Sequence, residues 1–307
     1  MDGSQLKRSL RDLLNESSTA AWMNDKTTYE YLNQAAVEFA LRTSCLRSTQ
    51  TIYTLALTPA YRLNADFVDV YLQTDQNAKY VRLNDGTTDR FITQEDYSSL
   101  VYRNNATASQ FPDRFSITDD DSPPPAISGT ASADGAVSAG QAVLNDGSAP
   151  FADVSIGDMF HNTTTGASGY VLAVTSTSVL STAIFNAAVT ASAWTSGDGY
   201  ELVPQGGRYN LVFDPPPSVS AYTVTVPYIQ KPHPVYSDYG VFRFPNEYTP
   251  TLVRYAFWLY KYRDSQPNFG DKMYVAFDND CKRFGYQVAK RLGRSPSSVR
   301  VNLKVRR

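Results

Sequence analysis

A run of 93 consecutive residues, 115–207, contains no lysine or arginine, although nine of its residues are aspartate or glutamate. The run is rich in Ser, Thr, Ala and Gly, and turn signals such as 145–147 (NDG) and 196–199 (SGDG) divide it into short segments. Some segments alternate apolar with small or polar residues, as in 169–174 (GYVLAV). Short strands separated by regular turns predict a small antiparallel barrel or sandwich.

The proline triplet 123–125 lies where the composition changes, and the 84 residues of 122–205 are enough for a β domain with its own core. When they are removed, 113–120 (DRFSITDD) joins 206–214 (GGRYNLVFD), and two adjacent strands read continuously. The host is therefore expected to fold without them. The predicted segments are a first part of the host core, 1–121; an inserted β-rich domain, 122–205; a second part of the host core, 206–294; and a basic C-terminal arm, 295–307.

Apolar residues at helical spacing predict two helices in the first 45 residues and two more after residue 245. Ser4 is the predicted N-cap of the first helix. The predicted fold class is α+β: a helical bundle packed with an antiparallel β-sheet, plus an inserted all-β domain. The residues predicted to share one face of each helix are Leu6, Leu10, Leu13 and Leu14; Tyr29, Leu32, Ala36 and Phe39; Leu252, Ala256 and Leu259; and Met273, Phe277, Cys281, Phe284, Val288 and Leu292.

Two stretches of the host alternate clearly enough to predict strands. In 51–57 (TIYTLAL) the larger apolar residues are Tyr53, Leu55 and Leu57, and 222–228 (YTVTVPY) alternates throughout. The second proline triplet, 215–217, is predicted to form a hairpin corner within the host sheet. Proline fixes φ and disfavours helix at the preceding residue, so this triplet forms a stiff extended turn.

The C-terminal end is strongly cationic. No acidic residue follows Asp280, and nine of the last 26 residues are lysine or arginine. The final residues, 297–307, alternate apolar and basic residues, which indicates a strand or an extended arm. Three interpretations remain open: a solvated end, an ordered arm that pairs with a neighbouring protein, and a DNA contact. The lack of aromatic residues after Tyr286 argues against the DNA contact.

The sequence contains no motif of nucleophilic, zinc, nucleotide-binding or dinucleotide-binding chemistry. Its two histidines, His161 and His233, lie in a polar turn and between prolines, and 119–121 (DDD) lacks the spacing of a calcium loop. Cys45 and Cys281 are predicted to be reduced. No stretch approaches the roughly 18 apolar residues of a membrane helix. We therefore predict a non-enzymatic protein with no catalytic residue, metal or cofactor and no membrane partner.

Two further stretches resemble a known class of proteins. Residues 206–232 (GGRYNLVFDPPPSVSAYTVTVPYIQKP) and 244–263 (FPNEYTPTLVRYAFWLYKYR), between an N-terminal helical pair and a basic tail, resemble the head–tail adaptor proteins of tailed bacteriophages, also called connector or head completion proteins. Residues 154–179 (VSIGDMFHNTTTGASGYVLAVTSTSV) are similar to small β modules of phage structural proteins. The insert is a departure from the minimal pattern of the adaptors.

This resemblance implies a structural protein of the virion neck that is assembled in the host cytoplasm. About twelve copies would form a dodecameric ring between the portal protein and a tail protein (nozzle, tube or fibre). Genomic DNA would pass through the channel during ejection without specific binding. The C-terminal arm would bind the portal through Arg294, Arg300, Val301, Leu303, Lys304, Val305, Arg306 and Arg307.

Two alternatives of different classes remain. The insert would make the chain a carbohydrate-binding or adhesion protein of the phage tail if some of its aromatic residues formed a sugar-binding platform; the whole chain has 21 tyrosines. A virion-associated peptidoglycan hydrolase would need a pair of carboxylates at a suitable separation, which a sequence does not reveal. No residue can be nominated for that pair.

Overall fold

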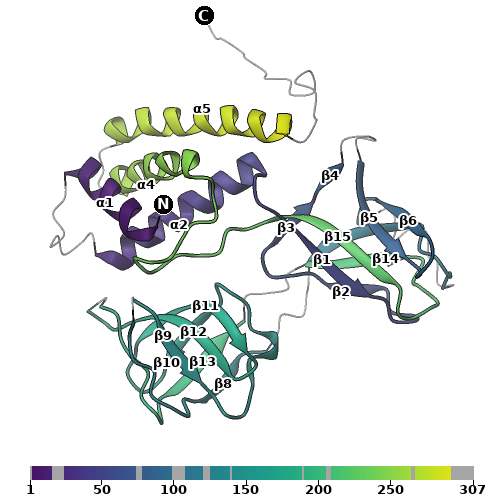
Figure 1. Cartoon of the computed structure of the whole chain (residues 1–307), viewed down its shortest axis with the longest axis horizontal. Coiled ribbons are helices and arrows are strands. Elements are labelled where there is room, and N and C mark those ends of the chain that lie inside the picture. The colour runs from purple at the N-terminus through teal and green to yellow at the C-terminus, as the bar shows by residue number, and fades with distance from the viewer. Residues whose placement is uncertain are drawn as a thin grey trace, which may run out of the picture.

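The computed structural model of the chain describes residues 2–15, 24–73, 78–98, 108–119, 125–138, 140–188, 190–204, 209–263 and 267–291. These residues form three units, which we call the helical layer, the host sheet and the insert sheet (Figure 1). The helical layer contains α1 (Gly3–Leu14), α2 (Asp25–Thr43), the short 3-10 helix η2 (Asn246–Tyr248), α4 (Thr249–Arg263) and α5 (Pro267–Arg291).

The first two helices of this layer are each capped by the side chain of the residue before their first residue. Asp2, rather than the predicted Ser4, caps α1, and its carboxylate accepts a hydrogen bond from Gln5 N at 2.8 Å. The side chain of Asn24 caps α2 in the same way. Most of the predicted faces are buried, but Leu13 is exposed, and Leu259, Met273 and Val288 are only partly buried. Leu292 lies outside the described residues. The buried residues of α1 and α2 include Leu6, Leu10, Leu14, Tyr29, Leu32, Ala36 and Phe39.

The host sheet has nine strands in the order β1-β15-β5-β6-β7-β14-β2, with β3 added beside β15 and β4 beside β5. All pairs are antiparallel except β6 with β7. Gln50 joins the two ends of this order, because its side chain donates to Arg62 O at 3.1 Å and accepts from Asn64 N at 2.9 Å. The sheet therefore curls upon itself. Its strands are β1 (Arg47–Tyr53), β2 (Ala60–Arg62), β3 (Phe67–Val70), β4 (Leu72–Gln73), β5 (Ala78–Asn84), β6 (Asp89–Gln94), β7 (Arg114–Asp119), β14 (Tyr209–Asp214) and β15 (Thr223–Gln230).

The strands on either side of the insertion are neighbours, as predicted. β7 pairs with β14 in antiparallel register, with Tyr209 opposite Asp119. The predicted domain boundaries stay predictions, because 120–124 and 205–208 lie outside the described residues. The prediction of a hairpin corner at 215–217 was wrong. The triplet does turn the chain from β14 to β15, but these strands have three others between them.

The insert sheet has six antiparallel strands in the order β8-β13-β10-β11-β12-β9. Ser132 N donates to Asn145 O at 2.8 Å, which links the residues after β8 to β9 and brings the two edges of the sheet together. Polar groups inside the sheet are paired: Tyr200 Oη donates to Asp146 at 2.5 Å. The strands are β8 (Ile127–Thr130), β9 (Ala142–Asn145), β10 (Met159–Asn162), β11 (Ser168–Ser176), β12 (Val179–Phe185) and β13 (Gly199–Val203), with a 3-10 turn, η1, at Phe151–Asp153.

The predicted fold class, a helical bundle packed with one antiparallel sheet plus an inserted β domain, was wrong. The described residues are mostly β, in two large curled sheets, and the few helices form a separate layer. Host strands such as β14 and β15 have one apolar face, and curling buries that face inside the sheet. The host core consists of β-sheet and loop residues alone: Ile52, Tyr61, Leu63, Phe67, Val70, Val81, Leu83, Ile92, Phe115, Leu211, Phe213, Tyr222, Val224, Val226 and Tyr228.

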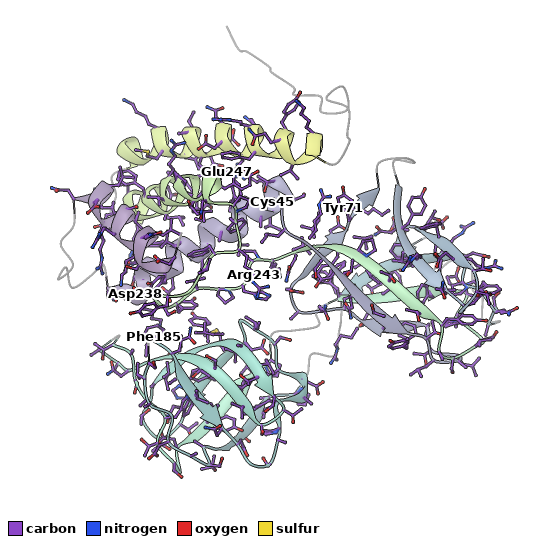
Figure 2. All side chains as sticks on the ribbon, in the orientation of Figure 1. Cys45, Tyr71, Phe185, Asp238, Arg243 and Glu247 are labelled. Atoms are coloured by element: carbon purple, nitrogen blue, oxygen red, sulfur yellow. The ribbon has the colours of Figure 1, made fainter. Side chains whose placement is uncertain are left out.

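The helical layer packs instead against the insert. Phe185 and Ala183 of β12 belong to the same apolar core as α1, α2, α4 and α5. Phe185 lies on the side of the insert that faces the helices (Figure 2). Next to it, the rings of Tyr170 and Tyr236 stack with centroids 4.4 Å apart and planes at 4°. Tyr236 belongs to the segment that leads from β15 to the helices, so the insert is held against both.

Candidate interaction surfaces

The predicted portal-binding residues, from Arg294 to Arg307, lie outside the described residues. The helix α5 before them is described, and it already contains part of the cationic run. Near its C-terminal end, a groove of about 610 Å³ is lined by Arg283, Phe284, Gln287 and Lys290 of α5 and by Glu247. The structure therefore places cationic and apolar side chains together on the helix that leads into the predicted arm.

The outer surface of the helical layer exposes large apolar residues. α5 covers the layer on one side (Figure 1), and its outward side chains include Val275 and Tyr286. The ring of Trp258 on α4 lies 4.7 Å from that of Tyr274 on α5, with the planes tilted by 43°, so aromatic rings of the two helices are in contact. Exposed apolar side chains on the four helices are Leu13, Leu41, Tyr262, Val275 and Tyr286. Such surface is typical of a contact with another protein.

A second, smaller cavity of about 350 Å³ lies between α1, α4 and α5, and we call it the apolar pocket. Arg254 is the one charged residue in its lining, and its guanidinium pairs with Asp280 of α5. Asp280 also accepts a hydrogen bond from Thr251 at 3.0 Å. The remaining lining residues are Ser9, Leu13, Pro250, Val253 and Met273.

Two loops at one end of the host sheet are bound together in a structure that we call the loop tip, residues 54–59 and 215–222. Leu57 N donates to Pro217 O at 2.8 Å. Thr54 Oγ1 donates to Val219 O at 3.0 Å and accepts from Tyr222 N at the same distance. This network keeps Leu55 and Leu57 exposed to solvent, with 59% and 72% of their surfaces accessible.

The backbone of the loop tip is strained on both sides. Leu57 has a φ of 63° and Ala221 a φ of 69°, in the left-handed region that favours glycine. Each such residue costs about 1–2 kcal/mol relative to ordinary backbone. Strain of this kind persists where the surrounding structure enforces it, and it is concentrated at functional positions. The loop tip is therefore a candidate functional surface.

Sequence reasoning missed this surface because it assigned the wrong phase to 51–57. The predicted apolar face, Tyr53, Leu55 and Leu57, is exposed, while Ile52 and Thr54 are buried. β1 ends at Tyr53, and the hydroxyl of Thr54 is buried because it bonds to the neighbouring loop. Alternation reveals the period of a strand but not which set of side chains faces inward. The nearby Pro59 was the available signal that the strand ends early.

A polar cleft of about 430 Å³ separates the host sheet from the insert sheet. Residues 62–66 line one wall, residues 152–156 line the other, and His233 lies between them. Asp66 accepts hydrogen bonds from Tyr228 at 2.9 Å and Gln230 at 2.5 Å, and its Oδ2 lies 3.6 Å from His233 Nε2.

The environment of Asp66 favours its charged form. Burial by itself would raise the pKa of this carboxyl group, but interactions with His233, Gln230 and Tyr228 outweigh burial and lower the pKa below its ordinary value. Because Gln230 ends β15 and His233 lies in the segment that follows, the carboxylate fastens this segment to the host sheet. The arrangement is suited to positioning a chain segment.

The other residues weighed in the sequence lie apart from one another. His161 is exposed on β10, far along the chain and in a different unit from His233, and Asp119 is exposed at the end of β7. Asp120 and Asp121 lie outside the described residues. Cys45 and Cys281 are free thiols, and burial raises the pKa of Cys281 to about 12, which makes this thiol unreactive.

The aromatic residues of the insert are used for packing, either in its own core or against the helical layer. Its sequence has six, and all lie within the described residues. Tyr170 stacks on Tyr236, and the other five are buried. The insert therefore offers no exposed aromatic ring among them for stacking on a sugar. The five are Phe151, Phe160, Phe185, Trp194 and Tyr200.

Within the described part of the chain, no helix is long and apolar enough to span a bilayer, and no group of three or more His, Cys, Asp or Glu side chains is placed to hold a metal ion. No model of a known protein family matches this chain, and no curated protein matches it either.

Proposed function

We propose that this chain is a structural virion protein that joins the portal vertex of a tailed-phage capsid to the tail. In this proposal it is one subunit of a ring whose channel lets DNA pass. The observation that supports this most directly is the outer surface of α5, where exposed Val275 and Tyr286 lie on the same helix as the groove formed by Arg283, Phe284 and Lys290. A helix that buries one face in its own chain and exposes apolar and cationic groups on another face is suited to binding a second protein.

The interior of the insert also supports a structural role. Its aromatic residues are used for its own core and for packing on the helical layer, as Phe185 and Tyr170 illustrate. In this proposal the insert widens the body of the subunit and stiffens it. The tail-side partner binds the ring on the side away from the portal, and the predicted arm, 295–307, binds the portal.

The test is to mix the purified full chain with portal rings of the same virus. We expect light scattering to give the mass of a portal ring plus several copies of this chain, and images of the particles to contain two stacked rings. A chain that remains separate from the portal at concentrations well above micromolar would overturn the proposal.

A truncated chain tests the predicted arm within the same assay. Removing 295–307 is expected to weaken portal attachment at least tenfold and to leave the circular dichroism spectrum unchanged. A matched control replaces Lys272 and Lys282, which are exposed on α5 outside the groove, with Gln; it removes two positive charges and leaves both the groove and the arm in place. Equal portal binding by the truncated and full-length chains would show that the arm is not the attachment.

A further inference from the structure

The loop tip is built to present leucines to a partner. Leu55 and Leu57 are mostly exposed, although hydrogen bonds fix the two loops on both sides of them. Leu57 is held there with a left-handed φ, and Ala221 of the facing loop has one as well. A chain that needed only to turn from β1 to β2 would do so with glycine or a polar residue at such positions. The exposed leucines therefore need a reason outside the subunit.

The apolar pocket has the complementary character. Its cavity of about 350 Å³ can admit the ends of two aliphatic side chains, and Leu13 at its edge is 41% exposed. Leu13 was expected in the buried stripe of α1 and is the one leucine of that stripe that lies outside the core. The structure therefore contains an apolar projection on the host sheet and an apolar recess on the helical layer.

The two features lie on units at opposite ends of the long axis of the molecule (Figure 1). They cannot meet within one subunit, but each further copy of the chain carries both a loop tip and an apolar pocket. We propose that copies associate head to tail, with Leu55 and Leu57 of one subunit entering the apolar pocket of the next. Such a contact joins different surfaces of the two copies, and repetition produces a ring when the rotation closes. This inference rests on the proposed function, because it names the contact between ring subunits.

The charges of the two surfaces favour a second copy as the occupant. Neither 53–59 nor 215–222 contains a charged residue. The one charged residue of the pocket lining, Arg254, is already paired with Asp280 inside the subunit. The contact therefore buries apolar surface without leaving an unpaired charge away from water. An acidic or basic peptide would find no partner charge in this pocket.

Cysteine cross-linking on portal-bound particles tests the contact directly. The double variant Leu57→Cys with Leu13→Cys should form a ladder of disulfide-linked multimers under mild oxidation with copper phenanthroline. Each single variant should give no ladder. Particles that contain the ring but give no ladder would overturn this contact while the proposed function stands. A wild-type chain that forms no particle with the portal would overturn the proposed function itself. Dimers from Leu57→Cys alone would indicate a symmetric contact and would also overturn the inference.

Complementation in solution provides an independent test. Leu57→Asp destroys the tip and Leu13→Asp destroys the pocket, so each variant should associate with itself at least tenfold more weakly than wild type in sedimentation experiments. A mixture of the two should form heterodimers, because one intact tip meets one intact pocket. Phe91→Asp and Leu41→Asp are matched controls, since each replaces a comparably exposed apolar residue elsewhere on the same unit. Equal loss in the controls, or no heterodimer in the mixture, would overturn the proposal. The proposal would also be overturned if removal of residues 292–307 made the cysteine of Leu13→Cys accessible to a thiol reagent. In that case the C-terminal tail of the same chain would occupy the pocket.

Discussion

The host sheet and the insert sheet are both curled antiparallel sheets, but they bury their apolar residues differently. Among the residues that the structure describes, the core of the host sheet contains none from the helices. The insert sheet has its own core, and in addition β12 supplies Ala183 and Phe185 to the core of the helical layer. The segment that interrupts the host sequence thus also contributes to the core of the helical layer. An insertion in sequence is therefore not always an appendage in structure.

The largest expected effect comes from deleting 122–205 and joining the ends with a short Gly-Ser linker. From sequence the host is expected to fold without this segment, but the packing of Phe185 and Tyr170 predicts that the helical layer loses about 3–6 kcal/mol of stabilisation. Hydrogen exchange should show reduced protection in α2 and unchanged protection in β15. Unchanged protection in α2 would mean that the insert does not stabilise the helices.

A substitution in the host core tests whether the host sheet is stabilised separately from the helical layer. Phe115 is fully buried among host strands, and Phe115→Ala is expected to cost about 3–5 kcal/mol. The loss should be confined to the host sheet, with α2 retaining its amide protection. Phe91→Ala, an exposed phenylalanine in the same sheet, is the control and should change the unfolding free energy by less than about 0.5 kcal/mol. Equal loss of protection in α2 and β15 would show that the two cores unfold together.

The interface between the insert and the helices gives a smaller effect. Phe185→Ala should destabilise the helical layer by about 2–3 kcal/mol, because the buried ring lies between the two units. Urea unfolding monitored at α2 and at the insert should show that the midpoints of both transitions move to lower urea concentration. Phe151→Ala, which lies within the insert core alone, should move only the insert transition. If Phe185→Ala leaves the unfolding transition of α2 unchanged, the interface contributes no stability to the helices.

The smallest expected effect concerns the junction at Asp66. The pKa of Asp66 is lower in the folded chain than its ordinary value, so the folded chain binds fewer protons at this site. The resulting stabilisation is complete above the ordinary aspartate value of about 3.9 and is lost as pH falls through the lowered folded value. Asp66→Asn should lower Tm at pH 6, by an amount equivalent to about 1 kcal/mol, and the difference from wild type should shrink below pH 4.

The control for this titration is Asp153→Asn, since Asp153 is exposed on the other wall of the same cleft. This variant keeps Asp66 and its hydrogen bonds from Tyr228 and Gln230, so its Tm at pH 6 should match that of wild type. A difference between wild type and Asp66→Asn that stays constant from pH 6 to pH 2 would contradict an ionised Asp66 that fastens the segment after β15.

Much of the local structure could be predicted from periodicity. The faces of the helices, the antiparallel strands of the insert and the pairing of β7 with β14 follow from patterns within short windows. The loop tip and the apolar pocket could not be predicted. Leu57 and Leu13 each fit a regular apolar pattern, but a hydrogen-bonded loop holds the first in water and the second lies beyond the edge of the α1 core.

The sequence by itself determined that helices form in the first 45 residues and after residue 245, that a segment of different composition interrupts the host, and that positive charge is concentrated at the C-terminal end. These properties depend on neighbours along the chain. Only the tertiary structure decided that the host sheet closes on itself and that Phe185 of the insert completes the helical core. An apolar face in the sequence indicates that the face is buried, but not which element packs against it. The packing partner depends on the curvature of the sheets and on residues far away in the sequence.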